Sequence, residues 1–152
     1  MAGYDFNRVS SYGLYPRDSD FTQLQSLPYY QRSRIEIAIE NKMHDLAMNY
    51  QPVEQADVII TYFVVQSDPS ELWQYNKQVR ACLGCTSKEQ RQLTKGLRSS
   101  TLIIDILDGQ TERSVYRAFS KLELNPKDNS DEQQQMIVAA VDNILNQLPN
   151  KR

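Results

Sequence analysis

The sequence of 152 residues lacks any apolar run close to the ~18 residues that a membrane-spanning helix needs. It is also poor in the residues of common catalytic and metal centres, with one histidine, two cysteines and five glycines. No GxSxG, GxGxxG or P-loop motif is present, so phosphate-binding loops are not supported. The net charge of −2 and the pI near 5.4 argue against a general nucleic-acid binder, which normally has a basic face.

The composition that is present is that of one globular domain. Hydrophobic residues make up 40% of the chain and charged residues 24%, which is enough apolar surface to build a core. We therefore expect a single domain over residues 1–152, in which residues 68–98 form a variable excursion.

The periodicity of apolar residues predicts about four strands and two long helices. The nearly continuous β-branched run VIITYFVV is typical of a central strand covered on both faces. Two other stretches have the apolar spacing of amphipathic helices, and Ser33 with Glu36 resembles a capping box at the first of them. The expected strands are Tyr4–Tyr15, Val58–Val65, Ser100–Leu107 and Arg113–Leu122, and the expected helices are Arg32–Met48 and Asp131–Leu148.

The order of these elements predicts an α+β fold. We expect a mostly antiparallel sheet of about four to five strands, with the two amphipathic helices packed on one face. Within the excursion, Asp68-Pro69-Ser70-Glu71 is a good helix start and predicts a short helix to about Arg80.

Two aspartates stand near the end of an apolar strand, in STLIIDILDGQTERSVYRA. Side chains alternate along a strand, so Asp105 and Asp108 are expected on opposite faces and not as a carboxylate pair that shares a proton. Asp108-Gly109 is a turn signal, because aspartate bonds its own backbone and glycine accepts a positive φ. The stretch therefore predicts a hairpin. Asp105 is expected to form a structural ion pair with Arg113 or Arg117, with a functional acid as the alternative.

A single CxxC motif, Cys82-Leu83-Gly84-Cys85, is the most chemical-looking feature of the chain. A closed zinc site needs four ligands and the only histidine is His44, so the motif does not predict a metal centre. A redox pair is one alternative, because Cys85 precedes a second helix start whose dipole would favour a thiolate. A local disulfide in an oxidising compartment and two ordinary thiols are the others.

An aromatic group on the excursion is a candidate surface for a protein partner. Trp73 and Tyr75, with Leu72, would form an exposed patch there, although such groups more often pack on the core. His44 lies beside the apolar stripe of the first helix and is expected to be an exposed or boundary residue.

Three stretches of the sequence, taken together, resemble a known family. They are an early YDF followed by Tyr12, RIEIAIENKMHDLAMNYQP with QADVIITYFV, and STLIIDILDGQTERSVYRAFS with IVAAVDNILNQLP. The family is domain-of-unknown-function family 4136, whose members are described as bacterial envelope lipoproteins. Its aspartate at the start of the second strand is matched by Asp57, and its G-T-L-x-I-D-x-x-D hairpin is matched from Thr101 to Asp108. Its I-L-x-x-(F/Y)-P ending is matched by Ile144 to Pro149.

The chain departs from the family pattern at a few positions. Ser100 stands where the family usually has Gly, and Leu148 replaces the aromatic residue of the ending. Tyr116 and Ala118 stand in place of Trp and Gly in a W-R-G run, of which Arg117 is retained. Residues from about Asp68 to Arg98, with the CLGC motif, are not part of the resemblance.

The resemblance implies a cellular setting. The native protein would begin with a secretory signal and a lipid-modified cysteine, and would sit in the periplasm, held to the cell membrane or outer membrane by acyl chains. MAGYDFNRV has no apolar segment typical of a signal peptide, and Met1-Ala2-Gly3 before a strand-like YDF looks like the start of a trimmed chain. That compartment favours a Cys82–Cys85 disulfide. No enzymatic activity is implied.

We therefore expect a non-catalytic envelope lipoprotein domain that acts as a binding or assembly module for an unknown protein partner, without cofactor, metal or nucleic acid. One alternative is a thiol-redox protein that uses Cys82 and Cys85. Another is a small-ligand binder with a pocket between the helices and the sheet.

Overall fold

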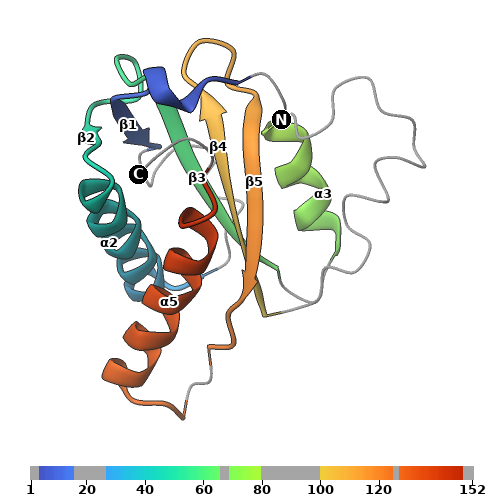
Figure 1. The fold of residues 1–152 in the computed structure, drawn as a ribbon. Coiled ribbons are helices and arrows are strands. Elements are labelled where there is room, and N and C mark those ends of the chain that lie inside the picture. Colours follow the sequence, from blue (N-terminus) through green and yellow to red (C-terminus); the bar gives the residue numbers. More distant parts are fainter. Residues whose placement is uncertain (1–3, 16–26, 66–68, 80–99, 125–126, 149–152) are drawn as a thin grey trace.

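A five-stranded sheet with helices on both faces forms the framework of the molecule (Figure 1). The computed structural model describes residues 4–15, 27–65, 69–79, 100–124 and 127–148. In chain order the elements are η1 (Phe6–Arg8), β1 (Ser11–Leu14), α2 (Tyr29–Asp45), β2 (Asn49–Tyr50), β3 (Val58–Val65), α3 (Pro69–Gln78), β4 (Thr101–Asp108), β5 (Ser114–Lys121) and α5 (Ser130–Leu145). The expected α+β fold is confirmed.

The sheet is mixed, so the expectation of a mostly antiparallel sheet is wrong. Its strand order is β2-β1-β3-β4-β5. β1 pairs in parallel with both β2 and β3, whereas β3–β4 and β4–β5 are antiparallel. The parallel part follows from the chain order, because α2 lies between β1 and β3 and carries the chain back to the end where β1 began. The two-residue strand β2 is too short to show a periodic pattern.

β3 is buried on both faces, as its continuous apolar sequence predicts. Val58, Ile60 and Val64 belong to the core that the sheet forms with α2 and α5. Ile59, Phe63 and Val65 belong to a second core, which α3 covers with Leu72 and Tyr75, together with Val79 just after the helix. The sheet is therefore the middle layer of three, and side chains that alternate along β4 reach either core.

The ends of α2 differ from those expected. The helix begins at Tyr29, after Pro28, whose carbonyl oxygen accepts hydrogen bonds from the N–H groups of Gln31 and Arg32. Ser33 therefore lies inside the first turns and is not the cap. The helix ends at Asp45, three residues before the expected Met48.

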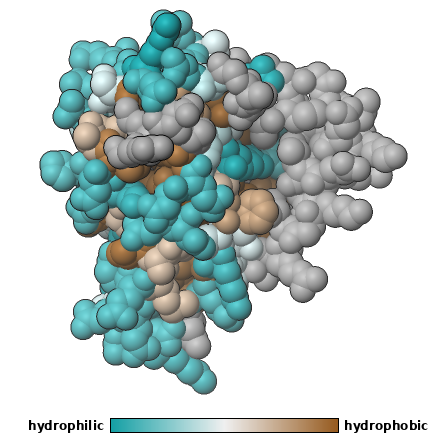
Figure 2. All heavy atoms as spheres, in the orientation of Figure 1, coloured by the Kyte–Doolittle hydropathy of each residue, from teal (hydrophilic) through white to brown (hydrophobic). Residues whose placement is uncertain are grey.

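α2 and α5 run in the same direction on one face of the sheet, and both begin at the end of the sheet where β3 finishes (Figure 1). On this side of the molecule most residues are hydrophilic, with smaller apolar areas between the helices (Figure 2). α3 lies within the excursion where a helix was expected. In the part of the chain that the structure describes, no helix is both long and apolar enough to cross a membrane.

Candidate functional site

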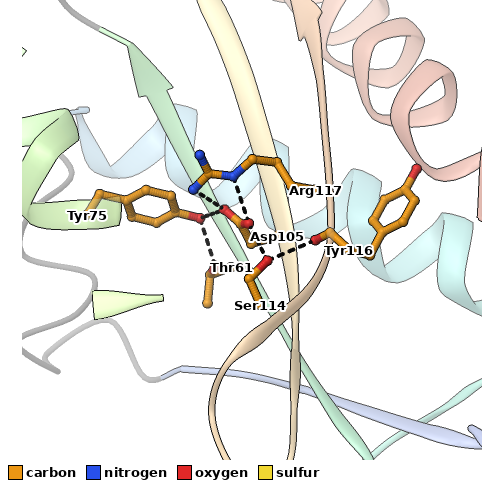
Figure 3. Close-up of polar contacts among 6 residues, drawn as sticks. All are labelled: Thr61, Tyr75, Asp105, Ser114, Tyr116 and Arg117. Atoms are coloured by element: carbon orange, nitrogen blue, oxygen red, sulfur yellow. Dashed lines mark hydrogen bonds and ion pairs between the residues drawn. The ribbon is translucent and has the colours of Figure 1, made fainter. Parts of the chain in front are cut away.

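A buried carboxylate, Asp105, is the centre of a polar network between the sheet and α3 (Figure 3). The side chain is 0% exposed and accepts four hydrogen bonds. Two come from hydroxyl groups, those of Tyr75 and Ser114, each at 2.7 Å. The other two come from Arg117, through Nε at 2.9 Å and Nη2 at 3.1 Å. Every side of this carboxylate is therefore occupied by a donor of the protein.

Strand register explains why these residues meet. Asp105 stands opposite Thr61 of β3 and opposite Arg117 of β5. All three side chains lie on the face that α3 covers, where the Tyr75 hydroxyl lies 2.8 Å from that of Thr61. A bulge between Ile106 and Leu107 on the β4–β5 ladder brings Ser114 to the same point. The network thus links β3, β4, β5 and α3.

The electrostatics of the network keep Tyr75 and Arg117 in single protonation states. Burial, and next the Asp105 charge, raise the pKa of Tyr75 well above its usual value. Burial by itself would lower the pKa of Arg117, but the Asp105 carboxylate outweighs it and the net effect is a raised pKa. Tyr75 is therefore a neutral donor and Arg117 a cation. With no exposed surface and four donors already in place, Asp105 is suited to holding the fold and not to proton transfer with a ligand.

Asp108 lies on the opposite face from Asp105, at the start of the hairpin turn. Its Oδ2 accepts a hydrogen bond from the N–H of Thr111 at 3.0 Å, and its Oδ1 lies 3.4 Å from the donating hydroxyl of Tyr4. Burial, followed by the Asp108 charge, raises the pKa of Tyr4 to about 12. Gly109 follows, and its N–H donates to the carbonyl oxygen of Asp57 at 2.9 Å. Asp108 therefore shapes the turn.

Asp57, which carries part of the family resemblance, ties the start of β3 to β1. Its Oδ2 accepts hydrogen bonds from the N–H and hydroxyl of Ser10 and from the N–H of Ser11, at 2.9 to 3.2 Å. The hydroxyl of Ser11 in turn accepts from the N–H of Asp57. The Ser10 N–H is the main cause of a lowered pKa for Asp57. Like Asp105, this carboxylate is engaged in structure.

The other sequence-predicted residues do not form one site. Trp73 and Tyr75 do not share one exposed patch, because Tyr75 is 1% exposed and packs in the core, which is the more common arrangement of such groups, whereas Trp73 is 47% exposed. His44 is exposed near the end of α2. Cys82 and Cys85 lie outside the described residues. Within the described ranges, no group of three or more His, Cys, Asp or Glu is placed to hold a metal ion.

A cavity of about 270 Å³ lies at the end of the sheet where β3 finishes, between the beginnings of α2 and α5. We name it the basal cavity. It is lined by Leu27, Pro28, Tyr30, Gln31, Val64, Val65, Ser100, Leu122, Leu124 and Gln133. By contrast, the void beneath the far ends of the two helices holds about 10 Å³, room for about one water molecule, and is no ligand pocket.

Two buried glutamines join the helices beside the basal cavity. Gln31 is 4% exposed and Gln133 is 6% exposed. The Nε2 of Gln31 donates to the Oε1 of Gln133 at 2.9 Å, and Nη1 of Arg34 donates to the same oxygen at 2.7 Å. The sequence reasoning missed both glutamines. The available signal was a polar residue in the first turn of each amphipathic helix, on its apolar side.

Comparison with known proteins shows the family of this chain. The model of the family described as "Domain of unknown function (DUF4136)" matches residues 2–150. The chain belongs to this family. Among curated proteins, no match was found.

Two solved structures have a similar fold to this DUF4136 domain. A crystal structure of a DUF4136 family protein from Bacteroides thetaiotaomicron VPI-5482 is matched with a TM-score of 0.59 and 12% identity, over 96% of this chain and 90% of that one. A PDZ domain protein from Parabacteroides distasonis ATCC 8503 is matched with a TM-score of 0.53 and 14% identity. That match covers 97% of this chain but only 33% of the other. At these identities the likeness shows the fold alone.

Proposed function

We propose that this DUF4136 domain is a non-catalytic binding module of a lipid-anchored protein of the cell envelope. The residues that carry the family resemblance, Asp57, Asp105, Asp108 and Arg117, hold strands, a turn and a helix together. Their arrangement supports a structural role for the family pattern. The binding function is then to be sought elsewhere on the domain.

The observation that carries the proposal is the basal cavity and its aromatic rim. Binding sites are concave, mostly apolar and furnished with a few oriented polar groups, and the basal cavity has these properties. Tyr30 lines it and is 58% exposed, and its neighbour Tyr29 is 65% exposed. Exposed tyrosines are enriched where proteins bind partners, because one ring offers a large contact area at low entropic cost.

The position of the basal cavity suits a protein anchored through its N-terminus. Tyr4 contacts Asp108, which pairs with Val58 at the start of β3. The basal cavity lies at Val65, at the other end of the same strand. Seven residue steps at ~3.3 Å separate these ends by about 23 Å. An acyl anchor ahead of residue 4 would therefore leave the basal cavity facing away from the membrane.

Site-specific photo-crosslinking in the native host tests this proposal. A benzophenone amino acid is placed in the full-length protein at Tyr30, and in a control at Tyr50, which is equally exposed at 56% but lies at the other end of the sheet. We expect a discrete adduct from the Tyr30 position and none from the Tyr50 position. Equal labelling at both positions, or no adduct at Tyr30, would contradict a binding role for this end of the domain.

A further inference from the structure

We infer that the basal cavity binds a neutral, hydroxyl-rich ligand, a single sugar unit of a carbohydrate. This inference rests on the proposed binding function and names its ligand class. It follows from three properties of the cavity: none of the described residues that line it is charged, two of its polar side chains are amides held in place, and an aromatic ring stands at its edge.

The absence of charge among the described lining residues disfavours an ionic ligand. None of the ten residues that line the basal cavity is Asp, Glu, Lys or Arg. The guanidinium of Arg34 lies nearby, but its Nη1 donates to Gln133 and the group lies 5.3 Å from the centre of the Tyr30 ring. A phosphate or carboxylate in the cavity would lose hydration without a cationic lining to replace it. A neutral ligand has no such cost.

Gln31, held in place by Gln133, supplies the hydrogen bonds that a hydroxyl group needs. Gln31 uses one N–H of its amide on Gln133, and its Oε1 receives only a 3.4 Å contact from Arg34. A second N–H and an acceptor site therefore stay open to a ligand. A hydroxyl group both donates and accepts, so it can satisfy the two together. Because both glutamines are buried and linked, their orientation is fixed before binding.

An apolar side chain from a protein partner fits this lining less well. It would cover the open positions of the Gln31 amide without a hydrogen bond, which is unfavourable because a buried polar group is then left unsatisfied. A sugar ring instead has an apolar C–H face, which can pack on the Tyr30 ring or on Val64, Val65 and Leu122 of the lining. The volume of about 270 Å³ is at the small end of ligand sites and suits one ring.

Nuclear magnetic resonance of the ¹⁵N-labelled domain tests the inference. Four probes are titrated separately: triacetylchitotriose and maltotriose as neutral sugars, trigalacturonate as a charged sugar of equal length, and the capped peptide acetyl-Leu-Val-Phe-amide. We expect saturable shifts of the Gln31 and Gln133 side-chain amide signals with at least one neutral sugar. Gln31→Leu should weaken that affinity at least tenfold, whereas Gln147→Leu, at an exposed position just after the end of α5, should leave it unchanged.

Each other result overturns the inference. Shifts with the peptide would indicate that the occupant is a protein. Shifts with trigalacturonate alone would refute the charge argument. No shift with any probe would show that the cavity does not bind a carbohydrate. If the spectrum of the Gln31→Leu variant loses its dispersion, the variant is unfolded and Tyr30→Ala is tested in its place. The exposed Tyr30 side chain can be truncated with little effect on the fold. The proposed binding function fails separately, by the absence of a crosslink at Tyr30 in cells.

Discussion

Four donors converge on the Asp105 carboxylate, and they come from elements that are separate in the sequence. Tyr75 brings α3 to the sheet, while Ser114 and Arg117 bring β5. Removing one partner of such a buried pair leaves a charge or a polar group without compensation, which is why these networks are costly to break. Such a network specifies one arrangement of the elements, and here it fixes the position of α3 on the sheet.

Tyr75→Phe is expected to destabilise the domain by about 1.5–3 kcal/mol, because the buried carboxylate loses a donor while the ring is kept. The stacked contact with Phe63, at 4.9 Å between ring centres, should persist. Urea denaturation measures the free energy of unfolding. Tyr50→Phe, at an exposed position, is the control and should change it by less than about 0.5 kcal/mol. Equal stabilities for both variants would show that the Tyr75 hydroxyl does not matter.

Asp57 makes stability depend on pH in the acidic range. Hydrogen bonds, first from the Ser10 N–H, lower its pKa below the ordinary 3.8, so folding favours the charged form. Its contribution is therefore complete above pH 3.8 and is lost as the pH falls through the folded-state pKa. We expect Asp57→Asn to be less stable than the wild type at pH 7, with the gap narrowing below about pH 4. A gap that is constant from pH 7 to pH 3 would argue against this role of the charge.

At the scale of elements, α2 ends in a common C-terminal motif, but the residue in its left-handed position is Ala47 where glycine is usual. The N–H of Ala47 donates to the carbonyl of His44 and the N–H of Met48 to that of Met43, which is the Schellman pattern. Ala47 has a φ of 62°, a left-handed conformation that usually requires glycine. The motif explains why the helix ends before Met48 although the apolar spacing continues.

Ala47→Gly is therefore expected to stabilise the domain by about 0.5–1 kcal/mol, since it removes the strain of the Cβ. Thermal denaturation should show a Tm higher by about 1–4 °C. Ala139→Gly, at an exposed position inside α5, is the matched control and should destabilise by about 1 kcal/mol. If both substitutions lower the Tm, Ala47 is not strained.

The hairpin turn between β4 and β5 is held against the segment before β3 by a close backbone contact. A Cβ on Gly109 would overlap the carbonyl oxygen of Ala56 and lie 2.7 Å from that of Asp57. Gly109→Ala should therefore push the two segments apart and cost about 1–3 kcal/mol, measured by urea denaturation. The neighbouring Gln110→Ala, at an exposed turn position, should be nearly neutral. A Gly109→Ala variant as stable as the wild type would show that the segments separate freely.

Local patterns predicted most elements, and their errors have local causes. The run Val58–Val65 and the helix start at Pro69 were readable because β-branched runs and Asp-Pro signals act over a few residues. The start of α2 was misplaced because its N-cap is Pro28, which has no side-chain acceptor and so gives no capping signal in the sequence. The direction of β1 was missed because pairing follows from the path of the whole chain.

At the scale of the whole molecule, the candidate site was harder to predict than the fold. Gln31 and Gln133 are 102 residues apart and meet only because α2 and α5 begin side by side. A motif of a few residues cannot predict a contact between residues that are so far apart in the sequence. The opposite case is Asp105 with Arg117, which face each other across one hairpin, so that strand alternation and proximity in the sequence were sufficient to suggest the pair.

The placement of the basal cavity at the end remote from Tyr4 matters only if the protein is anchored through its N-terminus. The most direct measurement is the intact mass of the full-length gene product recovered from membrane and soluble fractions of its native host. The account predicts a membrane-bound form, cut at an N-terminal cysteine and carrying acyl chains. An unprocessed protein in the soluble fraction would contradict it.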